Sequence, residues 1–164
     1  MRHLAVLFLF VLGVSAVLAV AESGAKTQVC VAKLDNNGSV VSPTVVRDDL
    51  IKFLDKTKNS QAEGVPVDTS IPGEALKAAK EKNCEYVVTT NVTEEHSDTG
   101  YTGGLAGVNM QTFYVTVEFH VLKVSDGTEV TKGAAKASDR GSAQNAIIAT
   151  TKKIAEKVND SIKK

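Results

Sequence analysis

The sequence of 164 residues has no tryptophan, only two cysteines and three prolines, and aromatic residues make up just 5% of it. Neither sign of charge is in excess, because 19 Lys and Arg residues balance 19 Asp and Glu residues. This balance argues against a nucleic-acid-binding protein, since such domains carry a strong basic excess. The scarcity of aromatic side chains means that the core is built from Val, Ile, Leu and Ala, within one domain of ordinary size.

The longest apolar run lies at the N-terminus. Residues 4–21 carry no charge, follow a single arginine and end in the small-x-small pattern Ala-Val-Ala. This arrangement is typical of a secretory signal peptide that is cleaved after Ala21. We therefore expect residues 1–21 to be a signal peptide and residues 22–164 to form one secreted or periplasmic domain. The alternative is an uncleaved membrane anchor, because 18 apolar residues are just long enough to span a bilayer.

Export would place the two cysteines in an oxidising compartment, where a disulfide can form. In an oxidising compartment, Cys30 and Cys84 are candidates for one disulfide, which would stabilise the fold by about 4 kcal/mol on the chain-entropy model. Two separate buried thiols are the alternative. Two cysteines without neighbouring histidines do not form a zinc site, and the sequence predicts neither a metal nor a cofactor.

The hydrophobic periodicity predicts eight elements in the order βαβαβββα, with one long amphipathic helix at the end. This order predicts an α/β protein of the α+β two-layer sandwich type, in which three helices lie on one side of a mixed sheet of about five strands. The second strand contains Pro66 and is expected at a sheet edge, because proline has no N–H to donate. The expected strands are residues 28–34, 64–68, 86–93, 112–124 and 129–137. The first expected helix begins at Pro43, and the other two cover residues 74–82 and 142–162.

Two segments in the second half of the chain carry a family resemblance. The segment NCEYVVTTNV at residues 83–92 follows a helix, and LKVSDGTEV at residues 122–130 joins two strands before the last helix. This plan resembles the N-terminal domain of TolB and the related periplasmic domains of CsgG and of the lipoprotein activators of penicillin-binding proteins, over residues 26–162. The resemblance implies an isolated recognition domain of the cell envelope that has no active-site residues. The β-propeller of TolB and the acylated cysteine of the activators have no counterpart in the sequence.

The most unusual local feature is the glycine-rich segment at residues 100–107. A phosphate-binding loop is disfavoured, because no Gly-Lys-Ser/Thr follows and no helix is predicted to begin there. A flexible loop between two strands is the simpler interpretation. If such a loop orders on a protein partner, the apolar side chains of Tyr101, Leu105 and Met110 are the predicted contacts.

Catalytic groups have little support in the sequence. His96 stands among three acidic residues at 94–98, where we expect a solvated polar turn rather than a metal cluster. Glu118 and His120 share one face of a strand, and an exposed sheet face is favoured there over an acid/base pair. No Gly-x-Ser-x-Gly elbow is present, and a Cys-His nucleophile needs a free thiol. We therefore predict no catalytic residues and a protein that is not an enzyme.

Together these features predict an exported, non-catalytic domain that recognises another component of the cell envelope through protein contacts. One alternative is a small-ligand-binding protein with a pocket between its helices and its sheet, and a less favoured one is a hydrolase with an unrecognised site. Nucleic acid is not an expected partner. Contact with a membrane is expected only if the N-terminal segment stays uncleaved.

Overall fold

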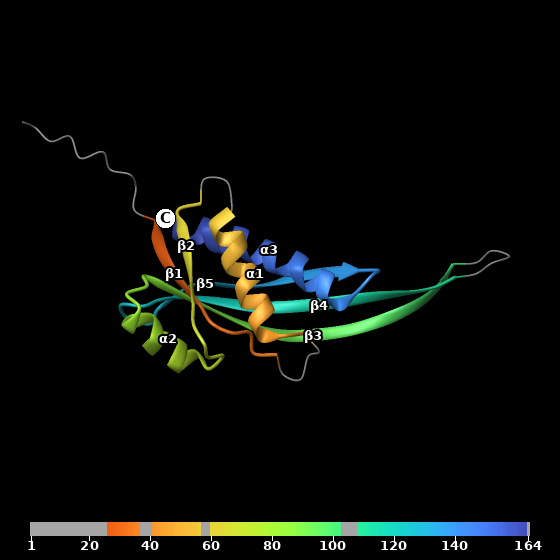
Figure 1. Cartoon of the computed structure of the whole chain (residues 1–164), viewed down its shortest axis with the longest axis horizontal. Helices are drawn as coiled ribbons and strands as arrows, with labels where there is room; N and C mark the ends of the chain where they lie inside the picture. Colours follow the sequence, from red (N-terminus) through yellow and green to blue (C-terminus); the bar gives the residue numbers. More distant parts are fainter. Residues whose placement is uncertain (1–25, 37–40, 57–59, 103–107, 164) are drawn as a thin grey trace, which may run out of the picture.

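The computed structural model describes residues 26–36, 41–56, 60–102 and 108–163, with residues 101, 102, 108 and 109 described by their backbone alone. Its elements follow the predicted order βαβαβββα (Figure 1). The strands are β1 (Thr27–Val31), β2 (Ala62–Pro66), β3 (Tyr86–Thr102), β4 (Val108–Lys123) and β5 (Glu129–Asp139), and the helices are α1 (Pro43–Lys56), α2 (Pro72–Glu81) and α3 (Ala143–Ile162).

The five strands form one mixed sheet, as predicted, and their order in it is β2-β1-β3-β4-β5. β1 pairs in parallel with β2 and with the start of β3, whereas β3, β4 and β5 pair antiparallel. Pro66 ends β2 at the outer edge of the sheet, where its missing N–H costs no ladder hydrogen bond. At the other edge, the Nζ atoms of Lys153 and Lys157 on α3 donate to outward carbonyls of β5.

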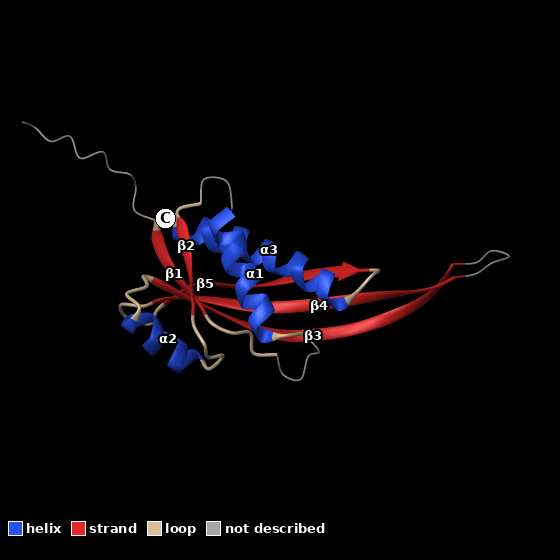
Figure 2. Ribbon diagram, in the orientation of Figure 1, coloured by secondary structure: helices blue, strands red, loops and turns tan. Residues whose placement is uncertain are grey.

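The helices lie on both faces of the sheet, so the expectation of helices on one side is wrong for α2 (Figure 2). The physical reason is the alternation of side chains along β1. Val29 and Val31 point into the larger cluster with α1 and α3, whereas Cys30 points to the opposite face, into a smaller cluster with Ala75 and Ala79 of α2. Because α2 is short, it covers only one end of its face.

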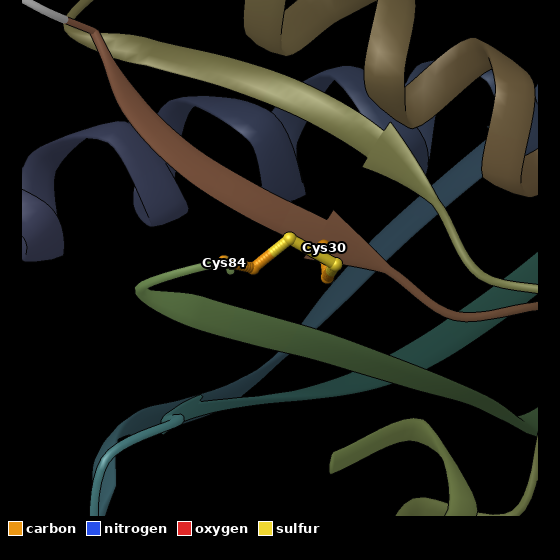
Figure 3. The surroundings of a disulfide bond; sticks show 2 residues. All are labelled: Cys30 and Cys84. Atoms are coloured by element: carbon orange, nitrogen blue, oxygen red, sulfur yellow. A yellow bond between two sulfur atoms is a disulfide. The ribbon is translucent and has the colours of Figure 1, made fainter. Parts of the chain in front are cut away.

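The disulfide between Cys30 and Cys84 is present, with 5.7 Å between the two Cα atoms (Figure 3). Both residues are buried beneath α2. The register of β1 on β3 explains the pairing, because Val29 lies opposite Tyr86 and Cys30 is therefore close to Cys84, two residues before β3 begins. The bridge therefore joins the central parallel strand to the start of the long hairpin.

A charged contact secures α1 to the loop that precedes α2. Arg47 is buried on α1, and its Nη1 donates to Asp68 Oδ1 at 2.6 Å. Lys33 Nζ lies 3.4 Å from the same oxygen. The two cations lower the pKa of Asp68, Arg47 through its hydrogen bond being the larger cause.

The long terminal helix α3 is amphipathic, as predicted. Ile147, Ile154 and Val158 are buried against the sheet and α1, and the hydroxyl of Ser142 caps the helix by accepting from Asn145 N–H. Among the helices that the structure describes, none is long and apolar enough to cross a membrane. The predicted signal peptide, residues 1–21, lies outside the described residues.

Candidate interaction site

Few other elements of the described chain pack against the far half of the β3–β4 hairpin. From Glu94 opposite Thr116 to Thr102 opposite Val108, the two strands continue as an antiparallel pair that extends beyond the body (Figure 1). β5 pairs with β4 as far as Phe113, so the rows from Thr116 to Phe113 are three-stranded and only the rows beyond them lack a third strand among the described residues. We call residues 94–102 and 108–116 the ribbon.

The ribbon begins at a β-bulge. The register shifts between Val92 and Glu94, which leaves Thr93 as the extra residue, and its hydroxyl lies 3.5 Å from the carbonyl of Thr116. A bulge increases the local twist and redirects a strand, which suits the point where the hairpin leaves the sheet. After the shift, Glu94 lies on the face opposite to α1 and α3, which we call the open face.

Polar contacts across the strands hold the ribbon. On the open face, Thr116 Oγ1 donates to Glu94 Oε2 at 2.9 Å, and the rings of His96 and Tyr114 stack with their centroids 4.8 Å apart. Gln111 Nε2 donates to Ser97 Oγ at 2.9 Å further along. The first two pairs lie where β5 still flanks β4, whereas the rows beyond Phe113 form a two-stranded hairpin, which alone is marginally stable in water.

The ribbon also carries charge of one sign. Between Lys82 and Lys123 the chain has five acidic residues and neither Lys nor Arg. Three of the acids, Glu94, Glu95 and Asp98, lie in the ribbon strand of β3. Glu95 points to the opposite face from its neighbours, and its Oε2 is buried without a hydrogen-bond partner among the described residues. The ribbon is therefore an acidic projection.

Two of the three predicted contact residues belong to the ribbon strands. The backbone of Tyr101 belongs to β3, opposite Asn109, and its side chain is outside the described part. Leu105 lies outside the described residues. Met110 is half-buried in β4, opposite Gly100. Of the loop predicted at 100–107, residues 100–102 belong instead to β3, and residues 103–107 lie outside the described part of the chain.

The expectation of a polar turn around His96 is wrong, because residues 94–98 belong to β3. The strand places Glu94, His96 and Asp98 on the open face and turns Glu95 away, so the three acids do not surround the histidine. His96 Nδ1 lies 3.5 Å from Glu94 Oε1. Within the described residues, no group of His, Cys, Asp and Glu is arranged to hold a metal ion.

The other catalytic candidates do not converge either. His120 Nδ1 lies 2.6 Å from Oε2 of Glu129 on the neighbouring strand, so its partner is this residue and not Glu118. Glu118 lies on the exposed open face, opposite Asn91 and Ala134. Both thiols are in the disulfide, which excludes a Cys-His nucleophile while the bridge is intact.

The open face is hollowed where the ribbon leaves the body. A solvent-open hollow of about 600 Å³ is lined by Glu94, His96 and Tyr114 of the hairpin and by Lys136 and Ser138 of β5, and it reaches Ala149 and Lys153 of α3 at the β5 edge. Sequence reasoning missed this group, because residues 93–99 are polar at every position and show no alternation that would assign them to a face. The register that brings β5 alongside them is not visible in the sequence.

No family model matches the chain, and no curated protein matches its sequence. The fold itself occurs in solved structures. A PelC dodecamer from Paraburkholderia phytofirmans is 19% identical, with a TM-score of 0.60 over 79% of this chain and 86% of that one. The hypothetical protein CT253 from Chlamydia trachomatis is 12% identical, with a TM-score of 0.57 over 84% and 98% of the two chains.

A third similar structure is lipoprotein GNA1162 from Neisseria meningitidis, at 11% identity and a TM-score of 0.50, covering 82% of this chain and 99% of that one. At these identities the likeness concerns the fold alone. The α/β fold implied by the family resemblance is therefore found. Membership of one of the named families stays a prediction.

Proposed function

We propose that the protein is an exported, non-catalytic domain that recognises another protein of the cell envelope through the ribbon. The observation that carries this proposal is the length of hairpin, from Asp98 opposite Thr112 to Thr102 opposite Val108, that continues past the end of β5 with no third strand among the described residues. A marginally stable ribbon gains most from a partner that covers it, because the partner supplies the missing contacts.

Two further observations support export and assembly. The Cys30–Cys84 disulfide is of a kind that forms and persists in oxidising compartments, in keeping with the apolar N-terminal run. Among proteins of similar fold, PelC was solved as a dodecamer and GNA1162 is a lipoprotein. Both are compatible with an envelope protein that works by contact with other chains.

The chemistry of the described residues supports a non-catalytic role. The candidate histidines pair with exposed carboxylates on a sheet face, His96 with Glu94 and His120 with Glu129. An active site instead gathers titratable groups in a cleft, with a nucleophile next to its base. A domain that acts by binding needs no such group.

Site-specific crosslinking in the intact envelope tests the proposal. A photoreactive residue at Gln111, which is exposed on the ribbon, is expected to give one dominant crosslinked product with another envelope protein. The matched control is the same residue at Lys77, exposed on α2. Shortening the hairpin between residues 97 and 113 is expected to abolish binding to that partner. A ribbon that crosslinks no more specifically than the α2 control overturns the proposal.

A further inference from the structure

The charges of the chain are separated along its sequence. Residues 83–122 carry five acidic residues and no basic one, whereas residues 123–164 carry nine basic and five acidic residues. The first stretch forms the hairpin, and the second forms β5 and α3. The two stretches are neighbours in the sheet, so one face of the molecule has an acidic and a basic side.

The strand register places these charges in matching rows on the open face. Glu94 of β3, Thr116 of β4 and Lys136 of β5 form one row across the sheet. Glu94 and Lys136 are two strands apart, about 10 Å, which is too far for an ion pair within one chain. Towards the ribbon, Asp98 on β3 lies level with the end of β5, after which Arg140 follows.

Tyr114 lies between the two charged sides. It stands on β4 in the row that joins His96 to Ser138, and its exposed fraction of 36% is high for a large apolar side chain. The hollow of about 600 Å³ opens beside it. In the described residues, neither Asp98 nor Lys136 has an ion-pair partner within the chain, so both charges are available to an outside group.

We propose that the open face binds a second copy of this chain about a two-fold axis that runs along β4 through Tyr114. Such an axis brings the open faces together and exchanges their two sides. The acidic β3 side of each copy then lies over the basic β5 side of the other. Glu94 faces Lys136 of the second copy, and the reverse contact forms at the same time.

The proposed interface has the composition of known ones, with aromatic side chains at the centre and complementary charges at the rim. Tyr114 of one copy lies against Tyr114 of the other, with the hollow beside it. Direct pairing of two ribbons side by side is disfavoured, because it places acidic strands together. The face is only three strands wide, so a weak, concentration-dependent dimer is expected.

One residue disfavours this dimer, and its substitution distinguishes a second copy of the chain from a partner with a basic surface. Glu118 lies on β4 in the open face, four residues from Tyr114 and close to the proposed axis. The axis brings Glu118 of the two copies towards each other, and like charges repel. Glu118→Gln is therefore expected to tighten the dimer, whereas a partner with a basic surface would bind this variant less well.

Sedimentation equilibrium of the purified exported protein tests the dimer. Glu94→Lys and Lys136→Glu are each expected to weaken it at least about tenfold, because each places like charges opposite each other twice. Glu81→Lys and Lys77→Glu, both exposed on α2, change the net charge equally and are expected to leave it unaffected. Raising the salt from about 0.05 M to about 0.5 M is expected to weaken the wild-type dimer.

Mixing the two defective variants gives the sharpest test. A heterodimer of Glu94→Lys with Lys136→Glu has opposite charges at both contacts, so it is expected to form with nearly wild-type affinity although neither variant pairs with itself. A mixture that stays monomeric, or a wild-type chain that stays monomeric at low salt, overturns the inference. A monomer that still crosslinks to one other envelope protein through Gln111 overturns only this inference. A dimer without such a crosslink overturns the proposed function instead.

Discussion

At the scale of single residues, the Cys30–Cys84 bridge has the largest expected effect on stability. It closes a loop of 54 residues between buried positions on β1 and just before β3. The chain-entropy model gives about 4 kcal/mol for a loop of this length. Reduction, or the double variant Cys30→Ala/Cys84→Ala, is expected to lower the free energy of unfolding by about this amount. Urea denaturation with and without reductant measures it, and equal midpoints would show that the bridge is not formed.

Asp68 makes part of the stability dependent on pH. Arg47, through its hydrogen bond, and Lys33 lower the pKa of Asp68 in the folded state. A lowered folded pKa means that the contribution is complete above the unfolded pKa of about 3.9 and is lost as the pH falls through the folded value. Asp68→Asn is therefore expected to be less stable than wild type at neutral pH.

The difference in stability between wild type and Asp68→Asn identifies the contribution of Asp68. It is expected to shrink below about pH 4 and to vanish once Asp68 is protonated in the folded state. The pKa of Asp126 and of Asp139 is also lowered, each by backbone N–H donors, but both residues are present in both chains and their effects cancel. Thermal unfolding of both chains from neutral to acidic pH measures the difference. A difference that stays constant across this range contradicts the assignment.

Residue types alone indicated some of the site and missed the rest. Two cysteines allow one pairing, so Cys30 and Cys84 were identifiable once export was inferred. The stacking of His96 on Tyr114 depends on which residues of two strands lie opposite each other, and the bulge at Thr93 shifts that register by one residue. A shift of one residue reverses every side chain that follows, so no local pattern predicts the acidic group on the open face.

At the scale of elements, the contact between β2 and α1 depends on a glycine. A Cβ built on Gly64 would lie 2.9 Å from Ile51 Cγ2 and 3.0 Å from Ile51 Cα, and the Cα cannot move without its helix. Gly64→Ala is expected to lower the free energy of unfolding by about 1–3 kcal/mol, as overpacking does elsewhere.

The matched control for Gly64 is Gly73 in the first turn of α2. A Cβ at Gly73 meets no atom within 4 Å. Gly73→Ala is therefore expected to raise stability by up to about 1 kcal/mol, because alanine is the better helix former. Urea denaturation of both oxidised variants gives the comparison. Equal effects at the two positions would mean that β2 does not pack against α1 in this way.

The elements themselves were largely predictable, because periodicity reports which side of a segment is buried. The alternation of Val115, Val117 and Phe119 predicted a strand, and the structure buries all three on the helix-covered face. What periodicity does not report is which face of a sheet a helix covers. The buried side of α2 consists of Ala75 and Ala79, and two small apolar side chains do not indicate which face of the sheet the helix covers. β3 continues beyond its last buried apolar residue, Val92, because β4 continues to pair with it.

At the scale of the whole molecule, the fold has two distinct ends. The start of β1 and the end of α3 lie at one end, and the ribbon extends from the other (Figure 1). Whatever precedes β1 therefore joins the body far from the surface that we propose binds partners.

The N-terminal segment is predicted to be removed on export. The small-x-small pattern directly after the apolar run favours cleavage before Glu22, and the intact mass of the exported protein is expected to equal that of residues 22–164 with the disulfide formed. Ala21→Leu is expected to block cleavage, because the peptidase site accepts small residues there, and to leave the chain in the membrane fraction. A wild-type chain that keeps residues 1–21 after export would contradict the predicted cleavage and support the alternative of an uncleaved anchor.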